Sequence, residues 1–291
     1  MKRNLPTEIK KKWRPRKRKS HKGDFGRICV LAGSKGYTGA AYLASAAAVR
    51  AGAGLVTLGV PESIYTIAAR RHAEVMVRPF ASTPKGSFAN KASRAIVEFA
   101  KTQDVIALGP GLSVHLETKK LVRQLIQKIQ KPIILDADGL NALVGQIHLL
   151  KACQRRMVLT PHPGEFRRLF GGPFSSNDHE RKARAREVAR HYQVVVVLKG
   201  AKTVVANEKG HVYVNPTGNP GMASGGTGDV LTGIIAAIAG QGFELWDAAR
   251  AGVFFHSLAG DIAAHQIGEI SLKATDIIDY LPQAFKKVLA K

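Results

Sequence analysis

Short, nearly continuous apolar runs alternate along most of the chain with longer alanine-rich or amphipathic stretches. Such runs are typical of strands buried on both faces of a parallel sheet, and the stretches between them have the spacing of covering helices. Strands are predicted at Arg27–Ala32, Leu55–Val60, Val105–Leu108, Pro132–Asp136, Met157–Thr160 and Val194–Lys199. Helices are predicted at Ala40–Arg50, Lys91–Lys101, Thr118–Gln130, Gly139–Leu143 and His179–His191.

The last third of the chain breaks this alternation. Two short β-branched runs, Thr203–Ala206 and His211–Asn215, are separated by only four residues and predict an antiparallel hairpin at one edge of the sheet. Three helices are then predicted, at Asp229–Ala239, Trp246–Gln266 and Thr275–Leu289. The pattern indicates one α/β domain with a mostly parallel central sheet and an antiparallel edge.

The charge of the chain is unusual for such a protein. Its 291 residues carry a formal net charge of +23, and residues 1–22 alone hold eleven Lys and Arg against one acid, Glu8. We therefore predict a basic, disordered tail at residues 1–19, ahead of the folded domain at residues 20–291. Such a tail can adsorb nucleic acid weakly and without sequence preference, because it neutralises phosphates.

The cysteines and the apolar runs exclude several other classes of protein. Two cysteines, Cys29 and Cys153, cannot form a disulfide framework, and they lack the spacing of a Cys-x-x-Cys metal site. No apolar run has the roughly 20 residues that cross a bilayer, and no apolar stretch follows the basic N-terminus as it does in a secretory signal. A cytoplasmic protein without membrane segments is expected.

Glycines and polar residues gather directly after five of the predicted strands. These segments are Gly33–Ala41, Gly109–Leu112, Asp136–Gly139, Thr160–Glu165 and Lys199–Thr203. In open parallel sheets, ligands bind outside the carboxyl ends of the strands. The five segments are therefore expected to line one cleft.

The densest such segment is Asn215–Asp229, which is rich in glycine and leads into an apolar helix. A helix N-terminus presents unpaired N–H groups and binds anions readily. Asp229 can act there as a helix cap, or as a base that takes a proton from a hydroxyl while the loop amides hold a phosphoryl group. The segment has neither the Gly-Lys-Ser/Thr of a P-loop nor the third glycine of a dinucleotide-binding fingerprint.

From Ser20 to the C-terminus, the chain resembles the ADP- or ATP-dependent NAD(P)H-hydrate dehydratases, members of the ribokinase-like superfamily. The motifs that carry the resemblance are Asp136–Asn141, Thr160–Glu165 and the Gly225–Asp229 loop with its lead-in Asn215–Asn219, in the family's order. The resemblance implies a three-layer ribokinase-like fold with helices on both faces of the sheet. Many relatives carry an additional N-terminal epimerase domain, so we expect a separate NAD(P)H-hydrate epimerase as functional partner. We also expect the chain to form a homo-oligomer.

The resemblance also implies a reaction. The substrate is the S form of hydrated NADH or NADPH, in which water has added across a double bond of the nicotinamide ring. ADP or ATP, with Mg²⁺, phosphorylates the new hydroxyl, and phosphate then leaves to restore NAD(P)H. Phosphate is a far better leaving group than hydroxide, which explains why a nucleotide is consumed.

By the same resemblance, Asp229 is the general base, and Gly225, Gly226, Thr227 and Gly228 form the anion loop. The nucleotide is expected along Lys199, Gly200, Ala201, Lys202, Thr203 and Gly228. The hydrated dinucleotide is expected to contact Ala41, Gly111, His162 and Asp229. No side chain is assigned as a direct metal ligand.

Other interpretations remain open at the level of sequence. His162 can be a structural loop residue, and Lys199 and Lys202 can be solvated. Asp136 and Asp138 can cap a helix or reach Mg²⁺ through water, and for both we favour a structural or water-mediated role over direct contact. A small-molecule kinase of the hydroxymethylpyrimidine or hydroxyethylthiazole kinase type would share the Asp229 loop but release a stable phosphorylated product. A nucleic-acid-binding protein explains the charge but not the glycine-rich strand ends.

Overall fold

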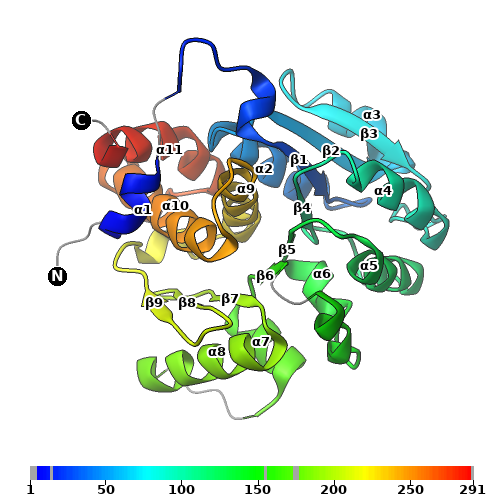
Figure 1. The fold of residues 1–291 in the computed structure, drawn as a ribbon. Helices are drawn as coiled ribbons and strands as arrows, with labels where there is room; N and C mark the ends of the chain where they lie inside the picture. Colours follow the sequence, from blue (N-terminus) through cyan, green and yellow to red (C-terminus); the bar gives the residue numbers. More distant parts are fainter. Residues whose placement is uncertain (1–4, 14–15, 154–155, 173–176, 290–291) are drawn as a thin grey trace.

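The computed structural model describes residues 5–13, 16–153, 156–172 and 177–289, and its centre is one sheet of nine strands (Figure 1). The strands are β1 (Arg27–Leu31), β2 (Leu55–Pro61), β3 (Met76–Phe80), β4 (Val105–Leu108), β5 (Ile133–Leu135), β6 (Met157–Leu159), β7 (Val195–Leu198), β8 (Val204–Ala206) and β9 (Val212–Val214). Their order is β3-β2-β1-β4-β5-β6-β7-β8-β9. Strands β1 to β7 pair in parallel, and β8 and β9 add an antiparallel edge.

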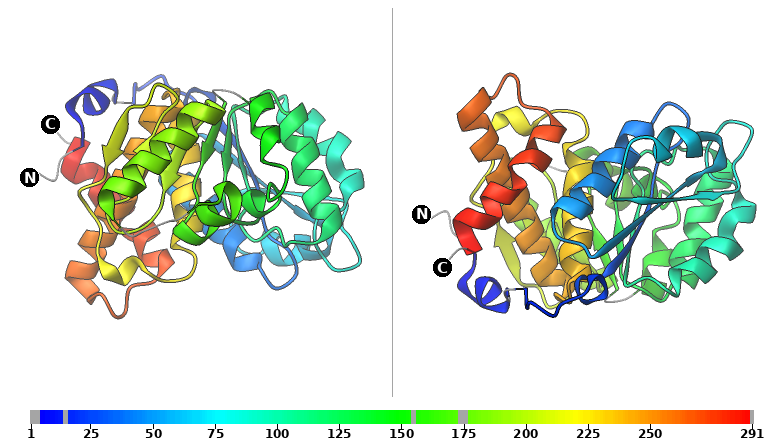
Figure 2. Two further views of the ribbon diagram at one scale, coloured as in Figure 1. Left: turned by 90° about the horizontal axis from the view of Figure 1, so that it is seen from below. Right: turned by 90° about the horizontal axis from the view of Figure 1, so that it is seen from above.

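The α-helices of the described residues lie on both sides of this sheet (Figure 2). They are α1 (Thr7–Lys12), α2 (Thr38–Arg50), α3 (Tyr65–Ala69), α4 (Ser93–Ala100), α5 (Leu116–Lys128), α6 (Ala137–Asn141), α7 (Pro163–Phe170), α8 (Asp178–Tyr192), α9 (Thr227–Gly240), α10 (Leu245–Ile267) and α11 (Ala274–Leu289). The predicted three-layer α/β class, the parallel sheet and the antiparallel edge hairpin are confirmed.

Alternation along each buried strand divides the core into two clusters. In β1, Ile28 and Val30 point to the cluster that contains α2, α9, α10 and α11, whereas Cys29 and Leu31 point to the cluster that contains α4, α5 and α8. Both faces of the strand are therefore covered, which explains its continuous apolar sequence. Helix α9 is buried from Val230 to Ala239, so its N-terminus is held rigidly at the edge of the sheet.

The structure corrects the expectation of a disordered tail for residues 5–13. Helix α1 lies beside α10 and α11 (Figures 1 and 2), and Leu5 and Ile9 are buried. The Trp13 ring packs against Phe243, Phe255 and Phe285 at centroid distances of 4.8, 5.4 and 5.5 Å. This apolar contact outweighs the tendency of a basic segment to stay in water.

Ion pairs connect the same arm to α10. Glu8 accepts from Arg250 at 2.8 Å, Lys12 pairs with Asp247, and Asp247 also pairs with Arg250. Burial alone would raise the pKa of Asp247, but hydrogen bonds from Lys12 and Arg250 lower it below its ordinary value. Lys12 of α1 therefore neutralises a buried carboxylate of the folded domain.

Neither cysteine is accessible. Cys29 lies in β1 and Cys153 near the start of β6, and both side chains are buried. Burial raises the pKa of the Cys29 thiol to about 12, and it raises the pKa of Cys153 as well. In the part of the chain that the structure describes, no helix has the length and apolar character of a membrane span.

Candidate active site

The five polar segments meet along the side of the sheet where the carboxyl ends of the parallel strands lie, and this side is called the site edge below. They follow β1, β4, β5, β6 and β7, which are consecutive neighbours in the strand order. Backbone hydrogen bonds join each end to the next: Gly33 N donates to Pro110 O (2.8 Å), Asp136 N to Leu108 O (3.1 Å), Thr160 N to Leu135 O (3.1 Å) and Lys199 N to Pro161 O (2.9 Å). The prediction that these segments come together is confirmed.

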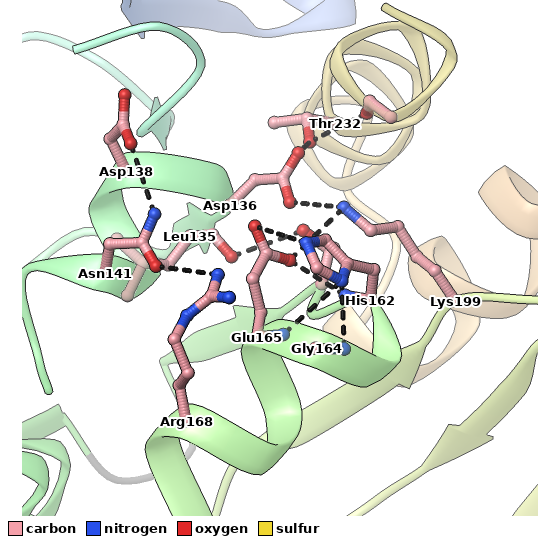
Figure 3. A network of polar contacts seen from close by, with 12 residues as sticks. Leu135, Asp136, Asp138, Asn141, His162, Gly164, Glu165, Arg168, Lys199 and Thr232 are labelled. Atoms are coloured by element: carbon pink, nitrogen blue, oxygen red, sulfur yellow. Dashed lines mark hydrogen bonds and ion pairs between the residues drawn. The ribbon is translucent and has the colours of Figure 1, made fainter. Parts of the chain in front are cut away.

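Asp136 and Lys199 form the charged centre of the site edge (Figure 3). Lys199 Nζ lies 2.7 Å from Asp136 Oδ1, and the Thr232 hydroxyl of α9 donates to Asp136 Oδ2 at 2.8 Å. Burial alone would lower the pKa of Lys199, but the carboxylates of Asp136 and Glu165 outweigh it and hold the pKa above its ordinary value. Lys199 is therefore charged and paired, and the interpretation of it as a solvated lysine is wrong.

Asp138 has a structural role in this geometry. Its carboxylate accepts from Ser113 N at 2.9 Å and from Asn141 Nδ2 at 3.2 Å. Asp136 occupies the N-cap position of α6 but makes no side-chain cap, because its oxygens are taken by Lys199 and Thr232. Asp136 thus links the ends of β5 and β7 to α9, and Asp138 links α6 to the segment after β4, as expected for structural contacts.

His162 begins α7 and caps it. Its Nδ1 accepts from Gly164 N (3.0 Å) and Glu165 N (3.4 Å), while its own backbone N–H donates to Glu165 Oε2 at 2.8 Å. This reciprocal arrangement is a capping box, and Figure 3 shows the Glu165 carboxylate beside the His162 ring. The imidazole side chain is still 49% exposed, so contact with a substrate remains compatible with its structural task.

The glycine-rich loop ends at the N-terminus of α9. Gly226 is the N-cap residue with φ 90°, and a Cβ there would lie 2.4 Å from Leu43 Cδ1, so only glycine fits. The Thr227 hydroxyl lies 3.1 Å from Met222 O and 3.0 Å from Ser224 O, so it is engaged within the loop. The loop can therefore offer an anion its backbone amides, rather than the Thr227 hydroxyl.

Asp229 is not the helix cap. It is the third residue of α9, inside the first turn, and none of the hydrogen bonds described for this part of the chain uses its carboxylate. Burial, reinforced by the negative charge of Asp136, raises the pKa of Asp229 to about 7, although Lys199 opposes the shift. A carboxylate with a pKa near neutrality is suited to accept a proton from a hydroxyl.

The turn between β7 and β8 carries the predicted nucleotide residues. Arg181 of α8 donates to Ala201 O at 2.6 Å, and Asp178 pairs with Lys202 Nζ at 3.0 Å. The Thr203 hydroxyl donates to Gly200 O at 3.0 Å. A cavity of about 550 Å³ lies between this turn and the first turns of α7 and α8. A larger cavity of about 1160 Å³, between α1, α10 and α11, contains none of the predicted site residues.

The remaining predicted residues lie on the β1 side of the site edge. Ala41 is in α2 and only 1% exposed, so its methyl group belongs to the core. Gly111 follows β4, and a Cβ there would lie 2.9 Å from Tyr37 Cβ. The two residues are brought to the site edge, as expected, and their contact with a substrate stays a prediction.

Sequence reasoning missed three residues that shape the site. Glu165 and Thr232 complete the environment of Lys199 and Asp136, and Arg181 is buried beneath the nucleotide turn. Glu165 could have been found, because a glutamate three residues after a helix cap is a recognised pattern. Thr232 and Arg181 leave no local signal, since their partners lie far away in the sequence.

Comparison with known proteins assigns the chain to a family. A family model for NAD(P)H-hydrate dehydratase matches residues 28–283. The chain belongs to this family. Its relatives include the bifunctional NAD(P)H-hydrate repair enzyme Nnr of Moorella thermoacetica, 45% identical over 275 residues, and that of Escherichia coli, 39% identical over 269 residues. These alignments cover 94% and 92% of the chain but 52% and 49% of the relatives, so the chain spans about half of their length.

Solved structures agree with the NAD(P)H-hydrate dehydratase family. The ADP/ATP-dependent NAD(P)H-hydrate dehydratase of Bacillus subtilis, co-crystallised with ATP and Mg²⁺, is 30% identical with a TM-score of 0.80, covering 97% of this chain and 96% of that one. A ribokinase-like protein of Enterococcus faecalis has a TM-score of 0.82 at 26% identity, covering 99% and 97%. A hydroxyethylthiazole kinase of Pyrococcus horikoshii, 15% identical with a TM-score of 0.64, shows only that the fold is shared.

Proposed function

We propose that the chain catalyses ADP- or ATP-dependent dehydration of the S form of hydrated NADH or NADPH. The observation that carries the proposal is the position of Asp229, a carboxylate with a pKa near 7 beside the free amides of the α9 N-terminus. Membership of the NAD(P)H-hydrate dehydratase family supports it. The hydroxyethylthiazole kinase alternative rests on fold similarity alone.

The reaction follows from this geometry in two steps. Asp229 takes the proton of the substrate hydroxyl, whose oxygen then attacks the terminal phosphorus, and the P–O bond to the remaining nucleotide breaks. The anion-loop amides of Gly226, Thr227 and Gly228 stabilise the charge on the moving phosphoryl group. The C–O bond of the phosphorylated ring then breaks, phosphate leaves with the electron pair, and loss of a proton from the adjacent carbon restores the double bond.

The residues at the site edge also fit Mg²⁺. The ion prefers oxygen ligands and is usually held by one or two carboxylates together with nucleotide phosphates and water. Asp136, Asp138 and Asp229 bring three carboxylates to this side of the sheet, but in the described part of the chain no group of three or more His, Cys, Asp or Glu side chains could hold a metal ion directly. When bound with the nucleotide, Mg²⁺ would neutralise phosphate charge, and we propose that these aspartates hold it through water.

Only the S form enters this reaction scheme. A site that accepts one configuration leaves the R form unused unless it is converted, so we propose an NAD(P)H-hydrate epimerase as functional partner. The bifunctional names of the relatives are consistent with this pairing.

The direct test supplies hydrated NADH with ADP or ATP and Mg²⁺ and follows the absorbance of the reduced nicotinamide. We expect absorbance to recover together with release of inorganic phosphate. Accumulation of a stable phosphorylated product would indicate a small-molecule kinase, and no recovery with either nucleotide would refute the dehydratase activity.

The pKa of Asp229 predicts the pH dependence of the reaction. The base must be deprotonated, so kcat/KM should rise tenfold per pH unit below about pH 7 and level off above it. Asp138→Asn removes a negative charge that raises the pKa of Asp229, so the midpoint should move to lower pH. A profile that stays flat from pH 5.5 to about pH 8 would contradict the assignment of Asp229 as the base.

Gly228 provides a test of the anion loop. A Cβ at this position would lie 3.2 Å from Lys199 Nζ and 3.8 Å from Asp136 Oδ2, on the side where the phosphate is expected. Gly228→Val should weaken ATP binding at least about tenfold in calorimetric titration, equivalent to about 1.4 kcal/mol. Gly228→Ala should have a smaller effect, since its methyl group only approaches the flexible lysine. A melting temperature that falls while affinity stays normal would show that Gly228 serves packing alone.

A further inference from the structure

A buried histidine contacts the anion loop from behind. His256 belongs to α10, is 7% exposed, and its Nε2 lies 2.9 Å from the carbonyl oxygen of Thr227. A carbonyl oxygen can only accept a hydrogen bond, so Nε2 carries the hydrogen and the ring donates. The contact joins α9 to α10, and its two residues are 29 positions apart in the sequence.

The imidazole makes this contact as a neutral group. Burial lowers the pKa of His256 to about 4, the Thr227 hydrogen bond opposes this shift, and the positive charge of Lys199 adds to it. The ring therefore keeps one hydrogen and no charge at neutral pH. Its role toward the loop is directional and does not depend on an ionic attraction.

The Thr227 carbonyl and the Gly228 N–H belong to one planar peptide group and point in opposite directions. A donor on the carbonyl fixes the plane of this group, and it also polarises the amide so that the N–H becomes a stronger donor. Gly228 N–H lies in the first turn of α9, where amides lack intrahelical acceptors and are available to an anion.

We propose that His256 is a positioning residue that orients and polarises the Thr227–Gly228 peptide toward the transferring phosphoryl group. The inference rests on the proposed function, because the phosphoryl group is the ligand of that amide.

The carbonyl of the next peptide, Gly228 O, has only a shared hydroxyl beside it. The Thr232 hydroxyl lies 3.2 Å from Gly228 O and 2.8 Å from Asp136 Oδ2. A hydroxyl has one hydrogen, and Thr232 donates it to the nearer acceptor, Asp136 Oδ2, so Thr227 O is the carbonyl of these two that a side-chain donor holds.

Three variants separate positioning from packing. His256→Leu removes the donor, whereas His256→Gln carries an amide nitrogen the same number of bonds from Cα and can restore it. His256→Asn is one bond too short. Phe255→Leu, on the same helix but packed against Trp13 and Phe285, is the matched control for loss of stability alone.

The readouts are ATP affinity by calorimetry, kcat and KM, the melting temperature, and the amide proton shift of Gly228 by NMR. In His256→Leu and His256→Asn we expect the Gly228 amide proton to move upfield and kcat to fall about tenfold, less than the loss of a whole oxyanion donor. His256→Gln should stay within about threefold of the wild type. Phe255→Leu should melt earlier without changing kcat or the Gly228 shift.

Two results would overturn the inference. The first is a folded His256→Leu with unchanged kcat and Gly228 shift. The second is an equal loss in the Gln, Leu and Asn variants, which would indicate packing. If the wild type binds no ATP, the proposed function fails together with the inference. If the wild type turns over normally and the His256 variants keep its kcat and Gly228 shift, only the inference about His256 fails.

Discussion

Asp229→Asn is expected to lower turnover of hydrated NADH by at least ~10²-fold while ATP binding survives. Asparagine preserves the shape of the side chain, and it leaves the amides of the α9 N-terminus in place, but it cannot accept the proton of the substrate hydroxyl. The measurement is steady-state recovery of nicotinamide absorbance, with ATP affinity determined separately. Near-normal turnover would show that another group takes the proton.

Two controls distinguish loss of the base from loss of the folded state. The pKa of Asp229 is raised to about 7 in the folded chain from an ordinary value of 3.8, so its contribution to stability is lost as pH rises toward 7. The Asn variant should therefore melt no earlier than the wild type at pH 8. Asp138→Asn, which changes charge at the site edge without removing the base, should lose less than about tenfold in kcat.

Deletion of residues 1–13 is expected to destabilise the fold by at least about 3 kcal/mol, because removal of even one buried aliphatic side chain costs about 2–5 kcal/mol. The deletion uncovers Phe255 and Phe285, and it leaves Asp247 without Lys12. We expect a clear decrease in the midpoint of urea unfolding. The contacts described for residues 5–13 go to Phe243, α10 and α11 and not to the active-site groups, so kcat should change little at temperatures where the shortened chain is folded.

A charge-only control distinguishes packing from electrostatics in the arm. Lys10 and Lys11 are exposed, whereas Ile9 is buried. Replacing both lysines with serine should alter stability by less than about 0.5 kcal/mol each. Ile9→Ala should reproduce much of the effect of the deletion. An unfolding midpoint for the deletion equal to that of the full chain would mean that the contacts of α1 contribute nothing.

The sequence predicted the elements whose signal is local. β1, β4, β5, β6 and β7 are short apolar runs, and the turn at Asn207–Gly210 identifies the β8–β9 hairpin. Strand β3 was missed, because Arg78 and Pro79 interrupt it and most of it is exposed at the sheet edge. The α1 arm was also missed, although Leu5, Ile9 and Trp13 recur every four residues and mark a helical face. Its charge hid that pattern.

The candidate site also has a part that the sequence predicts and a part that only the structure shows. Glycine-rich strand ends are visible in sequence, and their convergence follows from the geometry of parallel sheets. The pairing of Lys199 with Asp136, 63 residues away, depends on strand order. The proximity of Asp136 to Thr232, across 96 residues, depends on where α9 crosses the sheet. Neither contact leaves a pattern in the nearby sequence, so only the structure shows the environment that raises the pKa of Asp229.

The burial of Cys29 and Cys153 has a consequence for the chemistry of the chain in an oxidising cell. The thiolate is the nucleophile that attacks peroxides and disulfides, and a raised pKa in a closed core keeps the thiolate population low. Both thiols therefore react only when the structure around them opens, and for Cys29 this means opening of the sheet, since Cys29 belongs to the interior strand β1. Oxidative inactivation should thus follow the rate of global unfolding, and a bound ligand that slows opening protects the thiols as well.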